Sequence, residues 1–409
     1  MIAFFRMFPS HALGILLLER GLWAMALLLL IPVGVLVAEC MVALLSHGSG
    51  TGAAQGCRPR VAVLVPAHNE AAGIRETLQT VKTQLTARDR LVVIADNCDD
   101  ETATLARSLG AEVIERQDPE RRGKGYALDY GLQFLAGDPP DVVVMIDADC
   151  RAHPEAIGRI ATLAFANMRP VQAIYLIDPP PNPSPKDAVS VLAFTVKNLV
   201  RPLGLTRMGF PSLLTGTGMA FPWQIIREAT LASGNIVEDM QLALDLAIAG
   251  YPPLFCADAQ VSGVLPQQQQ AAKRQRTRWE HGHLQTLLTQ VPRLLKAAVQ
   301  QTRFDLVAIA FDLCIPPLSL LVLLWLLVMV TALACGWLGT SWMPIGLVTM
   351  EGFLMFCSIF AAWFKFGRAG LPARTLLAIP LYILWKLPLY LAFLIQPEKK
   401  MDSHRKGCY

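Results

Sequence analysis

The stretch VVVMIDADC at Val142–Cys150 decides the fold, because a run of β-branched and apolar residues ends there in two aspartates. Similar runs, VAVLVPA, RLVVIAD and AEVIER, alternate with helix-like segments at Ala71–Leu85, Glu101–Leu109 and Gly125–Leu135. Alternation of this kind predicts an α/β domain with a parallel sheet and helices on both of its faces. Ligands of such sheets gather beyond the carboxyl ends of the strands, so we expect the site there.

Four acidic residues lie at or just after these predicted strand ends: Glu70, Asp96, Asp147 and Asp149. Alternate residues of a strand face the same way, so Asp147 and Asp149 can point at one ion. Carboxylate oxygens suit Mg²⁺ or Mn²⁺, which bind substrate phosphates as well. Such a metal would neutralise charge on a diphosphate leaving group. An isolated DxD is also found as a solvated turn, and the context favours the metal.

The composition indicates a protein with a membrane region. Of its 409 residues, 53% are apolar and only 17% are charged, which is a low charge content for a purely soluble enzyme. The net charge of +4 is mild, and no basic stripe with interleaved aromatics is present, so we expect no nucleic-acid partner. The nine cysteines form no CxxC, which favours reduced, buried thiols in a protein that faces the cytosol.

Apolar runs flank the α/β part on both sides. Before it, Gly21–Leu45 has the length of a bilayer span, whereas Met1–Leu18 favours an interfacial position. After it we expect about three spans, drawn from Leu306–Trp337, Pro344–Phe364 and Leu376–Ile395. The predicted regions are 1–45 for the interfacial segment and first span, 46–60 for a linker, 61–265 for the catalytic domain, 266–304 for the QRTRW segment with interfacial helices, 305–395 for the later spans and 396–409 for a basic tail.

The basic residues beside these spans give conflicting predictions for which side of the membrane each segment faces. The Lys365–Arg374 loop is basic and should be cytosolic. The tail is basic too, yet one span before a cytosolic domain and three after it would place the tail outside. A re-entrant last segment, which is rich in proline, would remove the conflict. The sequence leaves this open.

Three further motifs carry candidate chemistry. Glu238-Asp239 starts a helix-like segment, where acids favour the helix dipole or where Asp239 acts as a general base. In QRTRW at Gln275–Trp279, the arginine suits bidentate phosphate contact and the tryptophan offers a flat face to a sugar, unless the segment is a solvated helix face. Lys124 follows a glycine turn that lacks the P-loop spacing but can still reach a phosphate.

Together these strings resemble the membrane-integrated family 2 glycosyltransferases, which include cellulose, hyaluronan and chitin-oligosaccharide synthases and ceramide glucosyltransferases. PAHNE, ADNCDD, DAD, ED and QRTRW occur in the family's order over Val61–Trp279. The resemblance implies a cytosolic GT-A (Rossmann-like) domain between transmembrane helices, in the inner (plasma) membrane. It also implies inverting transfer from a nucleoside-diphosphate sugar, with a UDP-sugar favoured, to a lipid or glycan acceptor.

The resemblance assigns roles to particular residues. It implies that Asp239 is the base and that Asp149 is the direct ligand of Mg²⁺ or Mn²⁺. Donor contacts are implied for Pro66, Glu70, Asp96, Lys124, Asp147, Asp149, Gln275 and Arg278, and acceptor contacts for Thr215, Gly216, Glu238 and Trp279. Phe194–Phe210, with Lys197, Arg201 and Arg207, is expected to form an amphipathic helix on anionic lipid, the alternative being a buried helix.

The chain also departs from the polymer-forming members of the family. It is short, has no regulatory domain, lacks an obvious gating loop after Trp279 and has fewer spans than a processive channel needs. A lipid or short acceptor is therefore as compatible as a growing polymer. Two rival hypotheses remain: a polyprenyl-phosphate acceptor, which needs no general base, and an inactive scaffold or export subunit. Loss of the DxD or ED carboxylates would mark a scaffold, and both are intact.

Overall fold

The computed structural model of the chain describes residues 9–45, 58–179, 184–232, 237–264, 269–368 and 371–395. The α/β domain is built on an eight-stranded sheet in the order β3-β2-β1-β4-β7-β6-β8-β5. Its first half is parallel and consists of β1 (Val61–Ala67), β2 (Arg90–Asp96), β3 (Glu112–Arg116) and β4 (Val142–Met145). The connecting helices are α2 (Ile74–Lys82), α3 (Thr102–Ser108) and α4 (Lys124–Leu135). All of these strands and helices were predicted from the sequence.

The second half of the sheet is mixed, whereas the alternation in the sequence predicted a parallel sheet. It consists of β5 (Cys150–Ala152), β6 (Val171–Asp178), β7 (Met219–Pro222) and β8 (Leu254–Val264), with α5 (Ala156–Asn167), α8 (Trp223–Ile226) and α9 (Glu238–Ile248). Strand β7 runs antiparallel to both β4 and β6. Two glycines at positive φ, Gly216 (+93°) and Gly218 (+66°), turn the chain just before β7. A left-handed backbone is most accessible to glycine, which explains the two glycines of the sequence TGTGM at Thr215–Met219.

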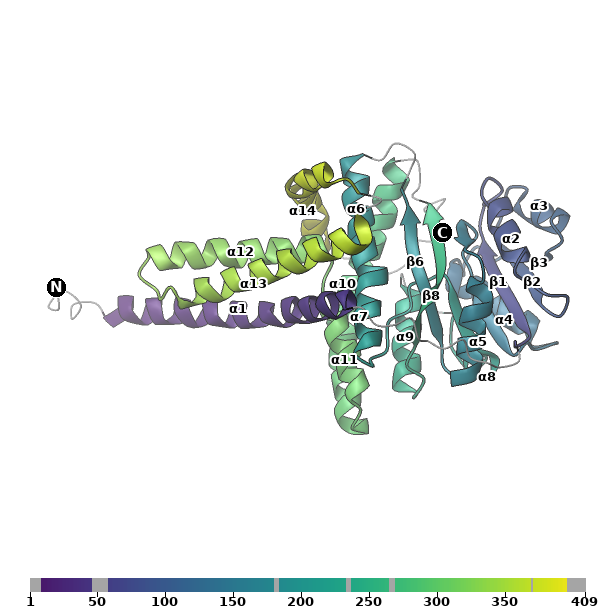
Figure 1. Cartoon of the computed structure of the whole chain (residues 1–409), viewed down its shortest axis with the longest axis horizontal. Helices are drawn as coiled ribbons and strands as arrows, with labels where there is room; N and C mark the ends of the chain where they lie inside the picture. The colour runs from purple at the N-terminus through teal and green to yellow at the C-terminus, as the bar shows by residue number, and fades with distance from the viewer. Residues whose placement is uncertain are drawn as a thin grey trace.

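Three long helices extend away from the sheet as a bundle (Figure 1). They are α1 (Pro9–Leu44), α12 (Leu318–Trp337) and α13 (Met343–Ala362), and their contacts place them side by side. Apolar side chains, among them Leu36, Val328 and Met355, pack together between them. Residues 9–18, part of the segment that was expected to lie at the membrane interface, belong to the same continuous helix as the first span.

Three helices and one composite helix cover the junction between bundle and sheet. These are α10 (Gln269–Gln301), α11 (Phe304–Leu313), the helix formed by α6 (Pro185–Thr195), a π turn (Val196–Val200) and α7 (Arg201–Arg207), and α14 (Ile379–Ile395), which follows a 3₁₀ turn (Ala373–Ala378). The described residues contain five helices long and apolar enough to cross a membrane: Leu13–Leu44, Pro185–Arg207, Leu318–Trp337, Met343–Gly367 and Ala373–Phe393. The second is 61% buried in its apolar window, against at most 33% for the others. The remaining four match the predicted arrangement of one span before the domain and about three after it.

Arg201 and Arg207 were expected to lie on a helix face that contacts lipid, but both contact other parts of the protein instead. Arg201 is 5% exposed and forms ion pairs with Glu39 on α1 (3.1 Å) and Asp312 on α11 (2.5 Å). Arg207 donates hydrogen bonds to the carbonyl oxygens of Ala43 (2.7 Å) and Leu45 (2.6 Å). Carbonyls at the end of a helix lack intrahelical partners, so this cation caps α1. The alternative of a buried helix is therefore the better description.

Gly204 lets α7 and α1 come into contact. A Cβ at this position would lie 2.2 Å from the carbonyl oxygen of Glu39. We expect Gly204→Ala to push the helices apart and to lower the free energy of unfolding by about 1–3 kcal/mol, the usual cost of overpacking. Thermal unfolding of the purified protein in detergent measures this. Gly34→Ala on α1, where a Cβ would meet nothing within 4 Å, is the matched control. An equal loss in both variants would contradict the prediction.

Candidate functional site

A cavity of about 340 Å³ lies where the carboxyl ends of β1 and β4 meet α10 and the membrane-side helices. All of the predicted site residues except Asp96 line it: Pro66, Glu70, Lys124, Asp147, Asp149, Thr215, Gly216, Glu238, Asp239, Gln275, Arg278 and Trp279. The parallel strands explain part of this convergence, since their carboxyl ends share one edge of the sheet. The motifs that are far apart in the sequence therefore meet around one space.

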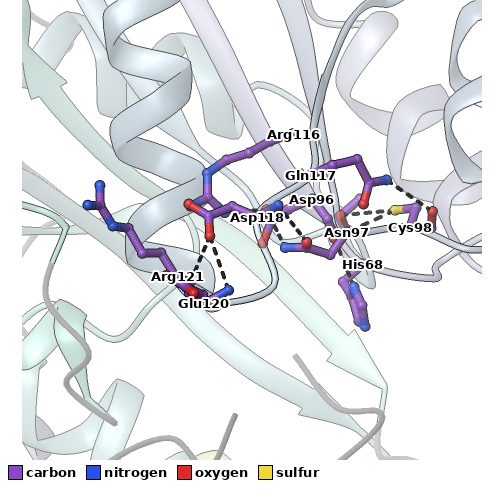
Figure 2. Close-up of polar contacts among 10 residues, drawn as sticks. His68, Asp96, Asn97, Cys98, Arg116, Gln117, Asp118, Glu120 and Arg121 are labelled. Carbon is purple, nitrogen blue, oxygen red and sulfur yellow. Dashed lines mark hydrogen bonds and ion pairs between the residues drawn. The ribbon is translucent and has the colours of Figure 1, made fainter. Parts of the chain in front are cut away.

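Asp96 is the exception, because its side chain is fully buried and does not line the cavity. The register of β2 and β3 places Asp96 opposite Arg116, and the two form an ion pair at 2.7 Å. Figure 2 shows Asn97 beside this pair, donating a hydrogen bond to the carboxylate of Asp96 (2.9 Å). The ring of His68, which does line the cavity, hydrogen-bonds the carbonyl oxygen of Asp96 (2.8 Å). Asp96 therefore does not contact the cavity itself but helps to position His68, which does.

The two aspartates of the DAD motif converge as their spacing predicts. Ligand atoms of Asp147, Asp149 and Cys150 all lie within 4.8 Å of one another. Burial raises the pKa of the Cys150 thiol well above its usual value, so it stays protonated and is a poor metal ligand. Cys150 instead donates a weak hydrogen bond to Asp149 (3.3 Å). The remaining donors are two carboxylates, which fit Mg²⁺ or Mn²⁺ together with water and phosphate oxygens.

Lys124, at the start of α4, connects several parts of the site. Its ammonium forms an ion pair with Asp147 and donates a hydrogen bond to the carbonyl oxygen of Gly216 (2.7 Å). Burial alone would lower the pKa of Lys124, but Asp147, Glu238 and Asp239 outweigh it and raise the pKa. Lys124 is therefore a fixed positive charge in the cavity, where a diphosphate could meet it.

The crowded carboxylates of the cavity have raised pKa values. Enclosure first, and then the charges of Asp149 and other acids, raise the pKa of Glu70 to about 7. Enclosure and the charge of Asp239 raise the pKa of Glu238 to about 7, although Lys124 and Arg278 oppose the shift. Like charges held together in a poorly hydrated space disfavour ionisation. A bound cation would relieve this repulsion, which is a further sign that the donor set fits a metal.

Asp239, at the start of α9, presents its carboxylate to the cavity. A Cβ on Gly216 would lie 3.3 Å from Oδ2 of Asp239, so the glycine turn runs directly beside the Asp239 carboxylate. Enclosure raises the pKa of Asp239, and the cations Lys124 and Lys197 oppose this. No described side chain donates a hydrogen bond to the carboxylate. An enclosed acid that faces a cavity and has no side-chain donor can accept a proton from a ligand.

The residues of QRTRW lie on α10. Gln275, Arg278 and Trp279 have the i, i+3 and i+4 spacing that places side chains on one helix face. The ring of Trp279 is 5.9 Å from that of Phe194, which in turn meets Tyr175 edge-on at 5.1 Å. These aromatics form a wall of the cavity between its polar end and the membrane-side helices.

Sequence reasoning missed Gln172, which orders the loop at 215–217. Gln172 is 1% exposed; its side chain accepts a hydrogen bond from the backbone of Thr215 and donates one to the carbonyl oxygen of Thr217, both at 2.8 Å. Thr217 in turn accepts a hydrogen bond from the backbone of Asp147 (3.0 Å). A single polar residue within the apolar run VQAIYLI was the signal for Gln172, since a buried amide needs partners.

Comparison with known proteins identifies the family. Residues 59–282 match the model of the glycosyltransferase like family 2. The chain belongs to this family. One relative is the probable glycosyltransferase YdaM of Bacillus subtilis, 27% identical over 276 residues, or 61% of each chain. Another is the low-salt glycan biosynthesis hexosyltransferase Agl6 of Haloferax volcanii, 34% identical over 107 residues, or 26% of this chain and 24% of Agl6. The chain thus spans less than two thirds of the length of either relative.

A solved structure has the same fold. It is the mannosyltransferase PcManGT from Pyrobaculum calidifontis, in complex with GDP-Man and Mn²⁺. It superimposes with a TM-score of 0.55 at 20% identity, over 90% of this chain and 99% of PcManGT. The predictions of a family 2 glycosyltransferase and of a GT-A-like α/β fold are confirmed. The roles given to individual residues stay predictions.

Proposed function

We propose that the chain is an inverting glycosyltransferase that moves a hexose from a nucleoside-diphosphate sugar to a hydroxyl of a membrane-associated acceptor. The observation that carries this proposal is the single cavity around which the DAD, ED and QRTRW residues meet and which reaches the membrane-side helices. The resemblance favours a UDP-sugar. The GDP-Man and Mn²⁺ in PcManGT support the same class of donor and cation.

In this proposal the donor diphosphate lies over the DAD motif. Asp149, with Asp147 beside it, would hold Mg²⁺ or Mn²⁺, and the bound cation would stabilise charge on the departing diphosphate. Lys124 and Arg278, which also line the cavity, add positive charges to it. Their charge costs no reorganisation as the diphosphate leaves, because the fold already holds them in place.

The acceptor lies on the other side of the sugar, near Trp279. Asp239 takes the proton from its hydroxyl while that oxygen forms a bond to the anomeric carbon. The bond from the anomeric carbon to the diphosphate breaks on the opposite face, and the diphosphate leaves with the electron pair. Attack from the opposite face inverts the anomeric configuration, so an α-linked donor gives a β-linked product.

The proposal places the domain in the cytosol. Lys365, just past the end of α13, donates a hydrogen bond to the carbonyl oxygen of Leu44 at the end of α1 (2.7 Å). Both helices end beside the α/β domain (Figure 1). Lys365 and Arg368, the basic residues that follow α13, therefore lie on the same side as the domain, and basic loops favour the cytosolic side.

Removal of the metal tests the proposed reaction. We expect nucleotide release from at least one of UDP-glucose, UDP-GlcNAc and GDP-mannose with Mn²⁺ in detergent, and its loss on addition of EDTA. Asp149→Asn should lower the release roughly 10²-fold or more, since it removes a charged ligand where leaving-group charge develops. Asp138→Asn, at an exposed ion pair with Arg60, should retain activity. No release with any donor would favour the scaffold or export subunit.

A further inference from the structure

An open pocket lies outside the candidate site, where α1 and α13 end beside the α/β domain (Figure 1). The two helices pack side by side, and α13 continues past Ala362 as a π turn (Trp363–Gly367). Of the described residues, four apolar and two basic ones line the pocket: Leu44, Phe360, Ala361, Phe364, Lys365 and Arg368. These six residues do not line the cavity that contains the DAD motif, so the pocket is separate from it.

The apolar walls of the pocket belong to two membrane-spanning helices. Leu13–Leu44 and Met343–Gly367, which provide them, are both long and apolar enough to cross a membrane. Phe360 and Phe364, one helical turn apart, are 56% and 53% exposed. Apolar side chains exposed on such a helix are covered by lipid, because the bilayer core holds no water. The hydrocarbon chain of a lipid is therefore the neighbour that these walls fit.

Lys365 and Arg368 follow the apolar residues along the chain and supply the polar part of the pocket. The Lys365 ammonium donates a hydrogen bond to the carbonyl oxygen of Leu44 (2.7 Å), which joins the two helices across the pocket. The Arg368 guanidinium lies over the ring of Phe364, 4.7 Å from its centre. Within the described residues Arg368 makes no hydrogen bond or ion pair. Its N–H donors are therefore open to a ligand.

Acidic residues are absent from both segments that form the pocket. Residues 40–69 and 352–397 contain no Asp or Glu. Arg207 adds a third positive charge, since it caps α1 through the carbonyl oxygens of Ala43 and Leu45. Among the residues that the structure describes, none of the three cations forms an ion pair. The ends of α1 and α13 are thus electropositive, and a ligand with net negative charge would complement them.

We propose that this pocket binds an anionic glycerophospholipid of the surrounding bilayer. Its phosphate accepts hydrogen bonds from Arg368 and Lys365, and one acyl chain lies along the apolar walls. A planar guanidinium can meet two phosphate oxygens at once, and stacking on Phe364 holds it in place for this contact. Basic pockets between membrane-spanning helices suit anionic head groups in the same way. The lipid contacts both helices and is not a substrate, so the proposal does not depend on the proposed reaction.

Lipid binding by the purified full-length protein in detergent tests the proposal. The protein is titrated with phosphatidylglycerol or with phosphatidylcholine of the same acyl chains, and native mass spectrometry measures each affinity. We expect the wild type to bind phosphatidylglycerol roughly tenfold more tightly, the worth of a hydrogen bond to a charged group. Arg368→Met should lose most of this preference. Ala361→Phe, which fills the pocket but keeps both cations, should weaken the binding of both lipids.

Arg374→Met is the matched control, because Arg374 is an exposed cation close to Arg368 in the sequence that does not line the pocket. It should keep the preference of the wild type. Equal affinity of the wild type for the two lipids, or equal preferences in Arg368→Met and Arg374→Met, would overturn the proposal. Displacement of phosphatidylglycerol by glycerol 3-phosphate at equal concentration would also overturn it, since the acyl chain would then contribute nothing. Thermal unfolding without added lipid confirms that each variant is folded.

Discussion

Asp239→Asn is expected to abolish sugar transfer while donor binding stays near normal. The carboxylate faces the cavity, no described side chain donates a hydrogen bond to it, and enclosure raises its pKa. An asparagine of the same shape cannot accept the proton of an acceptor hydroxyl. General-base catalysis contributes roughly 10²–10⁴-fold to rate, so turnover should fall by at least that factor. Product formation by mass spectrometry and donor affinity by calorimetry measure the two effects separately.

A control on the same helix separates this effect from a general loss of charge on α9. Asp245 pairs with Arg293 at 2.6 Å, and both side chains are about half exposed (45% and 46%). Asp245→Asn should leave turnover within about twofold, because exposed pairs are worth little. Near-normal turnover of Asp239→Asn would refute the base assignment. It would favour a polyprenyl phosphate as the attacking group, since an ionised phosphate needs no base.

The parts of the site that sequence could predict depend on local pattern. Strand β4 is a continuous apolar run, and the DAD spacing then fixes that Asp147 and Asp149 lie at its carboxyl end. The order of strands and helices in the first half of the domain also follows from alternation over short distances. The motifs could be assigned to one cavity because parallel strands share one edge.

The parts that sequence could not predict depend on pairing between distant segments. Asp96 lies at a strand end like Asp149, yet the register of β2 with β3 buries it against Arg116. Strand β7 has only four residues, too few to show a pattern, and its antiparallel direction follows from the glycine turn before it. The periodicity of the helix at 185–207 is the same whether lipid or protein covers Arg201. Arg201 is buried because it pairs with Glu39 on α1 and Asp312 on α11, which are distant in the sequence.

Arg201→Met is expected to destabilise the whole chain. Arg201 is 5% exposed and forms ion pairs with two buried acids from distant segments, Glu39 at 0% and Asp312 at 5% exposure. Removal of one partner leaves uncompensated charge in a buried site, which costs about 3–5 kcal/mol. We expect a large drop in the unfolding temperature and in the yield of folded protein, measured in detergent by thermal unfolding and size-exclusion chromatography.

Two further variants show whether charge or packing causes the loss. Arg293→Met removes a cation whose ion pair is about half exposed, and it should cost about 0–1 kcal/mol. The triple variant Glu39→Gln, Arg201→Met, Asp312→Asn removes all three charges and should recover most of the stability, because replacement of a whole buried ion-pair network is often neutral. If the triple variant is as unstable as Arg201→Met, the arginine acts through its packing between α1 and α11. If Arg201→Met loses no more than Arg293→Met, the buried ion pairs do not hold the membrane helices to the catalytic domain.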